Sequence, residues 1–180
     1  MSQHIPVALL PCDESVLPHA KSWAVAWTVA HGEHSLQDYF ATLKVPCFLP
    51  RVFKRCVYKS GVKSWSLPLF PGYVFFDPTA IERHRVFESR KVADILLPSN
   101  PLELQHELTQ IAFAIVKDSG LRESRFGRPG RPVYVARGPM KGLYGELVRL
   151  KSECRLILRV GFLGKAVELA IDDAYVEPVL

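Results

Sequence analysis

The sequence predicts an α+β N-terminal domain with a mostly antiparallel sheet and flanking helices, followed by a linker and a small all-β barrel. In residues 21–116, apolar runs rich in strand-forming residues alternate with stretches whose apolar residues recur at helical spacing. Residues 117–130 hold three glycines, several charges and little apolar periodicity, which is typical of a linker. In residues 131–180, short apolar runs alternate with glycine turns, and no long helix fits.

The first elements are expected to be a strand and a helix. Residues 1–20 contain several prolines and are expected to form a flexible leader. Trp23–Val29 is a continuous apolar run rich in strand-forming residues, which predicts a central strand. After Gly32, apolar residues recur at the spacing of an amphipathic helix, and Pro46 ends that helix.

A hairpin is expected next. Its first strand runs from Cys47 to Tyr58, a turn lies near Ser60-Gly61, and the second strand returns from Val62 to Phe76. A short helix over Thr79–Ser89 and a short strand over Val92–Leu97 follow. These elements would complete the sheet of the first domain.

The last helix of the first domain begins at a capping sequence. Asn100 suits the N-cap, Pro101 suits the first helical position, and Glu103 suits the third. Apolar residues at helical spacing then predict one buried face: Leu104, Leu108, Ile111, Ala112 and Ile115.

The barrel is expected to fold alone and to remain β-structured. Its runs are rich in β-branched residues, which form helices poorly. A short closing strand near the end of the chain is expected to complete the barrel. The other predicted strands are Val133–Ala136, Leu143–Leu150, Leu156–Val160 and Val167–Ile171.

Composition favours a soluble cytoplasmic protein that is not an enzyme and needs no cofactor. The 180-residue chain has a net charge of +5, which suits a polyanionic neighbour such as nucleic acid. Its four cysteines lack C-x-x-C spacing, so we expect no zinc site or disulfide framework and a reducing compartment. We find no membrane-spanning apolar run, signal-peptide pattern, P-loop, G-x-S-x-G sequence or dinucleotide fingerprint.

The most apolar and aromatic run of the chain is Pro68–Phe76. Pro71 cannot donate a ladder hydrogen bond and Gly72 marks a bulge, so the strand is expected to start through a kink. Tyr73 and Phe75 then share one face. An aromatic face left open on a soluble domain marks a protein interface, whereas the alternative is a strand buried on both faces.

Two motifs resemble those of the NusG-type transcription factors. Leu69-Phe70-Pro71-Gly72-Tyr73-Val74-Phe75 resembles the signature strand of their N-terminal (NGN) domain. Arg131–Val148, with a tight glycine-rich loop between two strands, resembles a KOW motif. Phe48-Leu49-Pro50 and Pro68-Leu69-Phe70-Pro71 are closest to the specialised paralogues, such as RfaH and UpxY. The resemblance covers residues 22–179.

The resemblance implies a monomeric elongation and antitermination factor that suppresses pausing or termination on selected operons. Its N-terminal domain would bind the RNA polymerase clamp near DNA or nascent RNA. Because the resemblance places Trp27 beside the signature strand, the expected polymerase-binding residues are Trp27, Phe70, Tyr73 and Phe75. The alternative is a KOW-containing RNA-binding or ribosome-associated protein, for which the net charge of +5 is mild.

The resemblance also implies a partner-binding surface around the glycine turns of the barrel. In some family members this surface binds a small-subunit ribosomal protein, and in others it binds Rho. Large apolar side chains in these turns have no obligatory core role, although Leu143 also fits a core position. The expected residues are Met140, Leu143, Phe162, Leu163 and Lys165.

Nucleic-acid contacts are expected at the predicted hairpin and before the first helix. The hairpin cations have no acid among them and favour phosphate contact, the alternative being a solvated face. They are Arg51, Lys54, Arg55, Lys59 and Lys63. His31 and His34 have metal-like spacing but no third ligand, so we expect either exposed histidines or a nucleic-acid contact, and no metal.

Overall fold

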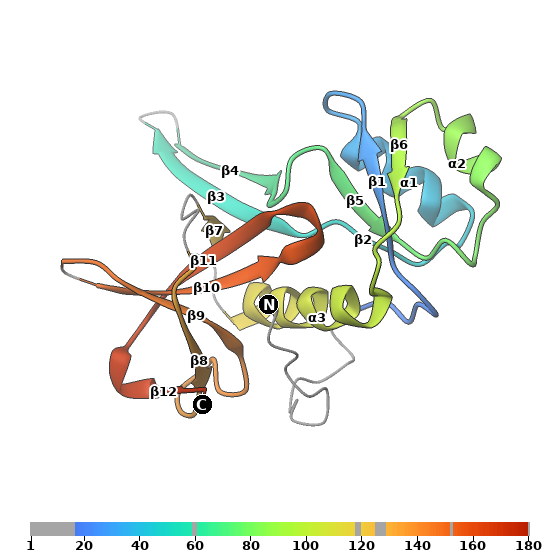
Figure 1. Cartoon of the computed structure of the whole chain (residues 1–180). Helices are drawn as coiled ribbons and strands as arrows, with labels where there is room; N and C mark the ends of the chain where they lie inside the picture. Colours follow the sequence, from blue (N-terminus) through green and yellow to red (C-terminus); the bar gives the residue numbers. More distant parts are fainter. Residues whose placement is uncertain (1–16, 59–60, 118–119, 125–128, 152, 180) are drawn as a thin grey trace.

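The structure is a computed structural model that describes residues 17–58, 61–117, 120–124, 129–151 and 153–179 (Figure 1). For residues 53–58 and 61–65 it describes the backbone alone. The described part has a mixed α/β fold with antiparallel sheets and few helices. No described helix is long and apolar enough to cross a membrane.

The first sheet, here called the N-terminal sheet, has the strand order β2-β5-β1-β6. The central strand β1 pairs antiparallel with β5 and β6, as predicted for this apolar run. A register shift interrupts its pairing with β6 between Trp27 and Thr28. The strands are β1 (Ala24–Thr28), β2 (Cys47–Phe48), β5 (Tyr73–Phe76) and β6 (Val92–Leu96).

Two helices pack on one face of the N-terminal sheet. They are α1 (Glu33–Thr42) and α2 (Arg83–Glu88), the latter shorter than the predicted helix over Thr79–Ser89. Alternate residues of β1 and β5 face this layer, because successive strand side chains point to opposite faces. The buried cluster there includes Ala24, Ala26, Leu36, Phe40, Val74, Phe76 and Val86.

The third helix, α3 (Pro101–Lys117), packs on the other face. It begins as predicted, since the Glu103 N–H donates to Asn100 Oδ1 at 3.3 Å. Its buried face joins the alternate residues of β1 and β5 in one apolar cluster. That cluster includes Trp23, Val25, Phe75, Leu104, Leu108 and Ile111.

The predicted hairpin is shorter than expected. β3 (Arg51–Tyr58) and β4 (Gly61–Pro68) form a separate two-stranded sheet that extends away from the N-terminal sheet (Figure 1). The prediction that the second arm continues to Phe76 was wrong, because β5 pairs with β1 and β2 instead. Pro71 has no N–H for a ladder, and Gly72 has φ +86°, so residues 69–72 turn away from the hairpin.

The second sheet, here called the C-terminal sheet, has the order β12-β8-β9-β10-β11-β7. All five predicted strands are present in it, and β7 adds a sixth. Its short helices are η3 (Gly161–Leu163) and η4 (Asp173–Tyr175). Its strands are β7 (Arg122–Glu123), β8 (Arg131–Val135), β9 (Tyr144–Arg149), β10 (Cys154–Val160), β11 (Lys165–Ile171) and β12 (Val176–Pro178).

Part of the expected linker and part of the expected leader are built into the fold. β7 pairs antiparallel with β11, and the Arg122 Nε donates to the buried Glu168 Oε1 at 2.6 Å. Two linker charges therefore belong to ion pairs with β11, Arg122 with Glu168 and Glu123 with Lys165, which a count of charges does not reveal. Leu17, within the expected leader, is buried in the cluster that α3 shares.

The same cluster continues into the C-terminal sheet. α3 packs against β10 and runs alongside the C-terminal sheet in Figure 1. Buried residues of both sheets thus meet α3 in one continuous core, rather than in two separate ones. The members from the C-terminal sheet and its loops include Val133, Met140, Leu143, Leu147, Leu156 and Leu158.

Candidate functional site

The predicted polymerase-binding residues divide into exposed and buried members. Trp27 on β1 pairs with Tyr73 on β5, and its side chain is 50% exposed. Tyr73 is half-buried and packs at the edge of the cluster around α3. Phe70 and Phe75 are completely buried, with ring centroids 6.2 Å apart in an edge-to-face contact. Trp27 and Tyr73 are therefore the two that solvent reaches.

The turn before β5 is held in place by a glutamate. The Gly72 N–H donates to Glu33 Oε1 at 2.7 Å, and the Gly72 carbonyl accepts from the Thr28 N–H at 2.8 Å. A Cβ added at Gly72 would lie 3.7 Å from Trp27 Cδ1, so the indole covers the turn. The buried Glu33 thus joins the start of α1 to the aromatic turn. The sequence shows an acid, Glu33, at the start of the predicted helix, but it does not show that the Gly72 N–H is its partner.

The predicted partner-binding residues of the C-terminal sheet divide in the same way. Met140 and Leu143 are buried in the shared cluster, so here Leu143 takes the alternative core position. Leu163 packs against that cluster and is half-buried. Phe162 is 40% exposed, and Lys165 Nζ lies 3.1 Å from Glu123 Oε1. Phe162 is thus the accessible apolar member.

The two predicted surfaces meet in this structure. Phe70 and Phe75 from the N-terminal sheet and its turn share one buried cluster with Met140 and Leu143. Tyr73 and Leu163 pack against the same cluster from its edge. A partner could contact any of the four buried side chains only after the elements that cover them have moved. Their binding roles therefore stay predictions.

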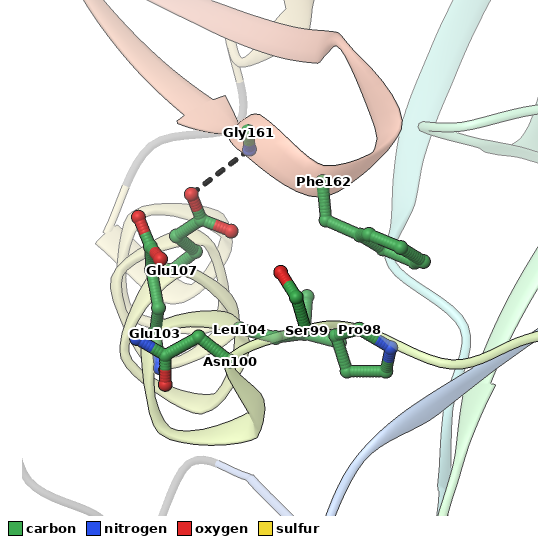
Figure 2. A pocket seen from close by; sticks show the side chains of 8 residues that line it. All are labelled: Pro98, Ser99, Asn100, Glu103, Leu104, Glu107, Gly161 and Phe162. Carbon is green, nitrogen blue, oxygen red and sulfur yellow. Dashed lines mark hydrogen bonds between the residues drawn. The ribbon is translucent and has the colours of Figure 1, made fainter. Parts of the chain in front are cut away.

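Among the described residues, two hydrogen bonds join α3 to the C-terminal sheet and its η3 turn. The Tyr144 N–H donates to Gln110 Oε1 at 2.6 Å in a buried position. The Gly161 N–H donates to Glu107 Oε1 at 2.9 Å (Figure 2). Sequence reasoning missed both acceptors, because a polar residue in an amphipathic helix does not reveal a partner far along the chain. The available signal in the sequence was the polar Gln110 directly before the apolar Ile111 and Ala112.

Beside the Glu107 contact lies a pocket of about 280 Å³. It is lined by the first turns of α3, by the residues just before α3, and by Gly161 and Phe162 of η3. Burial raises the pKa of Glu107 to about 7, the Gly161 N–H opposes this rise, and the charge of Glu103 adds to it. Figure 2 shows Glu103 and Glu107 on the pocket side of α3 and Phe162 opposite them.

The hairpin cations fall at positions of both faces of the two-stranded sheet. Arg55 lies opposite Ser64, and Lys63 lies opposite Cys56, the next residue along β3. Because successive strand positions alternate in face, Arg51 and Arg55 occupy positions of one face, and Lys54 and Lys63 those of the other. Lys59 and the side chains of Lys54, Arg55 and Lys63 lie outside the described residues. The phosphate contact stays a prediction.

The predicted histidines lie exposed at the start of α1. His31 has φ +57°, in the left-handed region, and His34 is in the first turn of the helix. The adjoining loop is tied to the residue just before β6, since the Val29 N–H donates to the Lys91 carbonyl at 2.8 Å. In the part of the chain that the structure describes, no three His, Cys, Asp or Glu residues group as metal ligands.

Comparisons with known proteins place this architecture in a family. No curated protein matches the chain. A solved structure described as "Domain interaction in Thermotoga maritima NusG" is similar at 15% identity, with a TM-score of 0.45, covering 88% of this chain and 97% of that one. The family described as "Transcription termination factor nusG" matches residues 21–112, just over half of the chain. The protein therefore belongs to the NusG family of transcription factors.

Proposed function

We propose that this NusG-family protein is an elongation and antitermination factor of the specialised type represented by RfaH and UpxY. Its N-terminal part binds the RNA polymerase clamp and suppresses pausing or termination on selected operons. Family membership supports the general class, since NusG-family factors bind RNA polymerase. The motifs over residues 48–50 and 68–71 support the specialised type.

The observation that carries the proposal is the exposure of Trp27 beside an anchored turn. Half of Trp27 is open to solvent, whereas Trp23, four residues earlier on the same face, is only 1% exposed. Bonds from Glu33 and Thr28 hold the adjoining turn, so the aromatic surface loses little freedom on binding. Exposed aromatic anchors on rigid supports are typical centres of protein interfaces.

Trp27 and Tyr73 make the first contact with polymerase in this proposal. They are accessible while the C-terminal sheet is docked, whereas Phe70 and Phe75 are not. The two phenylalanines are completely buried and take no part in this first contact. On the other side, Phe162 is the residue through which the C-terminal sheet first reaches a ribosomal protein or Rho.

The test is the affinity of Trp27→Ala for RNA polymerase, measured on the full chain. Loss of a central aromatic anchor costs about 2 kcal/mol, or roughly thirtyfold in Kd. Leu97→Ala is the matched control, since Leu97 is 63% exposed and outside the predicted surface. Equal affinities of the two variants would remove Trp27 from the site. Binding to RNA or ribosomes with no affinity for polymerase would favour the ribosome-associated alternative.

DNA contact by the hairpin is tested through its salt dependence. Replacing Arg51, Lys54 and Arg55 with Ser should flatten the log–log salt slope of binding to upstream or non-template DNA by roughly one unit per lost phosphate contact. The control removes equal charge elsewhere through Arg85, Arg90 and Arg137, all exposed. Affinity for free polymerase should change little. A wild-type salt slope in the hairpin variant would leave those cations as a solvated face.

A further inference from the structure

We propose that Asp94 makes the aromatic surface of Trp27 and Tyr73 a receptor for a basic side chain of its protein partner. An arginine of the partner lies over the indole of Trp27 and places its guanidinium group against the Asp94 carboxylate. This inference rests on the proposed function, in which the surface binds RNA polymerase, and it names the chemistry of the residue that the surface meets there. Asp94 thereby favours partners that present a cation at this position.

Tyr73, Trp27 and Asp94 form one row across three strands of the N-terminal sheet. Trp27 on the central strand β1 lies directly opposite Tyr73 of β5 on one side and Asp94 of β6 on the other. Directly opposite residues of antiparallel strands project to the same face, with their Cβ atoms about 5 Å apart. The carboxylate therefore borders the indole on the side away from Tyr73.

This row is the open end of the sheet face that α3 covers. The next row consists of Phe75, Val25 and Leu96, which pack in the cluster around α3. In the open row, by contrast, Trp27 is 50% exposed and the side chain of Asp94 is 52% exposed. Among the described strand residues of this face, Asp94 is the only charged one. A partner on the aromatic surface therefore meets one carboxylate beside apolar and aromatic side chains.

The chain itself places an arginine between an aromatic ring and this carboxylate. Arg83 of α2 lies over the ring of Phe87, with Cζ 5.4 Å from the ring centroid, and its Nη2 lies 3.6 Å from Asp94 Oδ1. Both members of this ion pair are more than half exposed, so water weakens it. Asp94 Oδ1 also accepts from the Ile95 N–H at 2.7 Å, whereas none of the described residues donates a hydrogen bond to Oδ2. Oδ2 is therefore available to a cation of the partner.

Arginine suits an indole beside a carboxylate better than other side chains do. Its planar guanidinium group stacks on an aromatic face and can donate two hydrogen bonds to a carboxylate at the same time. A cation over an indole is attracted by the electrons of the ring, and this attraction grows when the contact excludes water. An acidic residue of a partner at this position would instead be repelled by Asp94. The row therefore favours a basic partner residue over an acidic one.

The test compares the affinities of the full-length protein and its Asp94 variants for RNA polymerase. Asp94→Asn keeps an oxygen for the Ile95 N–H but removes the charge, and it should bind about fivefold more weakly. Asp94→Lys sets a like charge against the partner cation and should bind on the order of twenty-five-fold more weakly. The matched control is Asp38→Lys, which makes the same change in net charge at an exposed position of α1 and should bind like the wild type.

Arg83→Gln separates partner binding from a purely structural role of Asp94. Because Arg83 competes with the partner for the carboxylate, its removal should tighten polymerase binding by about twofold. This gain should vanish in the double variant with Asp94→Asn, where no charge remains to compete for. If Asp94 served only to pair with Arg83 and the Ile95 N–H, Arg83→Gln would not tighten binding.

Two results would overturn the role of Asp94. One is an Asp94→Lys variant that binds polymerase no more weakly than Asp38→Lys does. The other is an Arg83→Gln variant that binds no more tightly than the wild type. Either result, obtained while Trp27→Ala still loses affinity, leaves the proposed function standing without the partner cation. A wild-type protein that does not bind polymerase at all overturns the proposed function and this inference together.

Discussion

The two sheets hold their glycine turns through the same kind of bond but from different parts of the molecule. In the N-terminal sheet, the Gly72 N–H donates to Glu33 of α1, a helix that packs on that same sheet. In the C-terminal sheet, the Gly161 N–H donates to Glu107 of α3, which lies against both sheets. If the sheets separate, the first turn keeps its anchor and the second loses it.

The helical positions of the two glutamates reinforce this difference. Glu33 lies in the first turn of α1 and is buried. Glu107 lies further into α3, one turn after Glu103, whose negative charge opposes ionisation. One bond thus lies within the N-terminal part, whereas the other joins α3 to the C-terminal part. A third such bond, from the Gly130 N–H to Glu146 Oε2 at 2.8 Å, lies within the C-terminal part.

The largest effect is expected where the C-terminal sheet shares its core with α3. Leu143 is completely buried, so Leu143→Ala should lower the free energy of unfolding by about 3 kcal/mol. Phe162→Ala, at a residue that is 40% exposed, should change it by less than about 1 kcal/mol. Urea unfolding of both variants measures the difference. Similar losses would mean that Phe162 belongs to the core as much as Leu143 does.

Removal of the bond between Glu33 and the Gly72 N–H should cause the next largest loss of unfolding free energy. Glu33→Ala leaves the Gly72 N–H without its charged acceptor, and we expect a loss of about 2 kcal/mol in unfolding free energy. Asp38→Ala on the exposed side of α1 is the control and should stay within about 0.5 kcal/mol of wild type. A Glu33 variant as stable as the Asp38 variant would show that the turn does not depend on this bond.

The smallest effect on the free energy of unfolding is expected at Glu146. Its hydrogen bonds, to the Gly130 N–H and to Arg159, both lie within the C-terminal part. Burial raises the pKa of Glu146, but hydrogen bonds from Arg159 and the Gly130 N–H outweigh it and leave the pKa below its usual value. A lowered acid pKa stabilises the fold above the unfolded value of 4.5, and this contribution disappears as the pH falls through the folded pKa.

Glu146→Gln should therefore cost about 1 kcal/mol at pH 7. The gap between variant and wild type should narrow below pH 4.5. Urea midpoints over a pH series measure that gap. A gap that stays constant down to acid pH would assign the cost to packing rather than to charge.

Periodicity predicted most elements of the fold, because it reports local contacts. The central strand β1, the capped start of α3 and the strands of the C-terminal sheet all follow from apolar spacing and glycine turns. The break between β4 and β5 was missed, although Pro71 and Gly72 were read as a kink. A kink alone does not say whether the chain keeps its partner strand or finds a new one. Here β5 pairs with β1 and β2 instead.

The candidate site was only partly predictable, because exposure depends on what covers a face. The pattern in β5 placed Phe75 on the face opposite Val74, but not under α3. Trp27 and Phe75 lie on the same face of the N-terminal sheet, yet one is 50% exposed and the other is buried. Likewise, the partners of Gln110 and Glu107 lie 34 and 54 residues away, beyond the reach of any local pattern.

The position of α3 in the chain has a consequence during synthesis. The helix ends at Lys117, whereas β8 to β12 lie at residues 131–178 and are made afterwards. At ribosomal speeds of roughly 5–20 residues per second, those strands arrive on the order of several seconds later. Until then, the side of α3 that will contact these strands is not yet covered by them. Glu107 and Gln110 make that side more polar. A wholly apolar side would expose an aggregation-prone helix surface on the nascent chain during this interval. The two polar residues reduce that risk of aggregation.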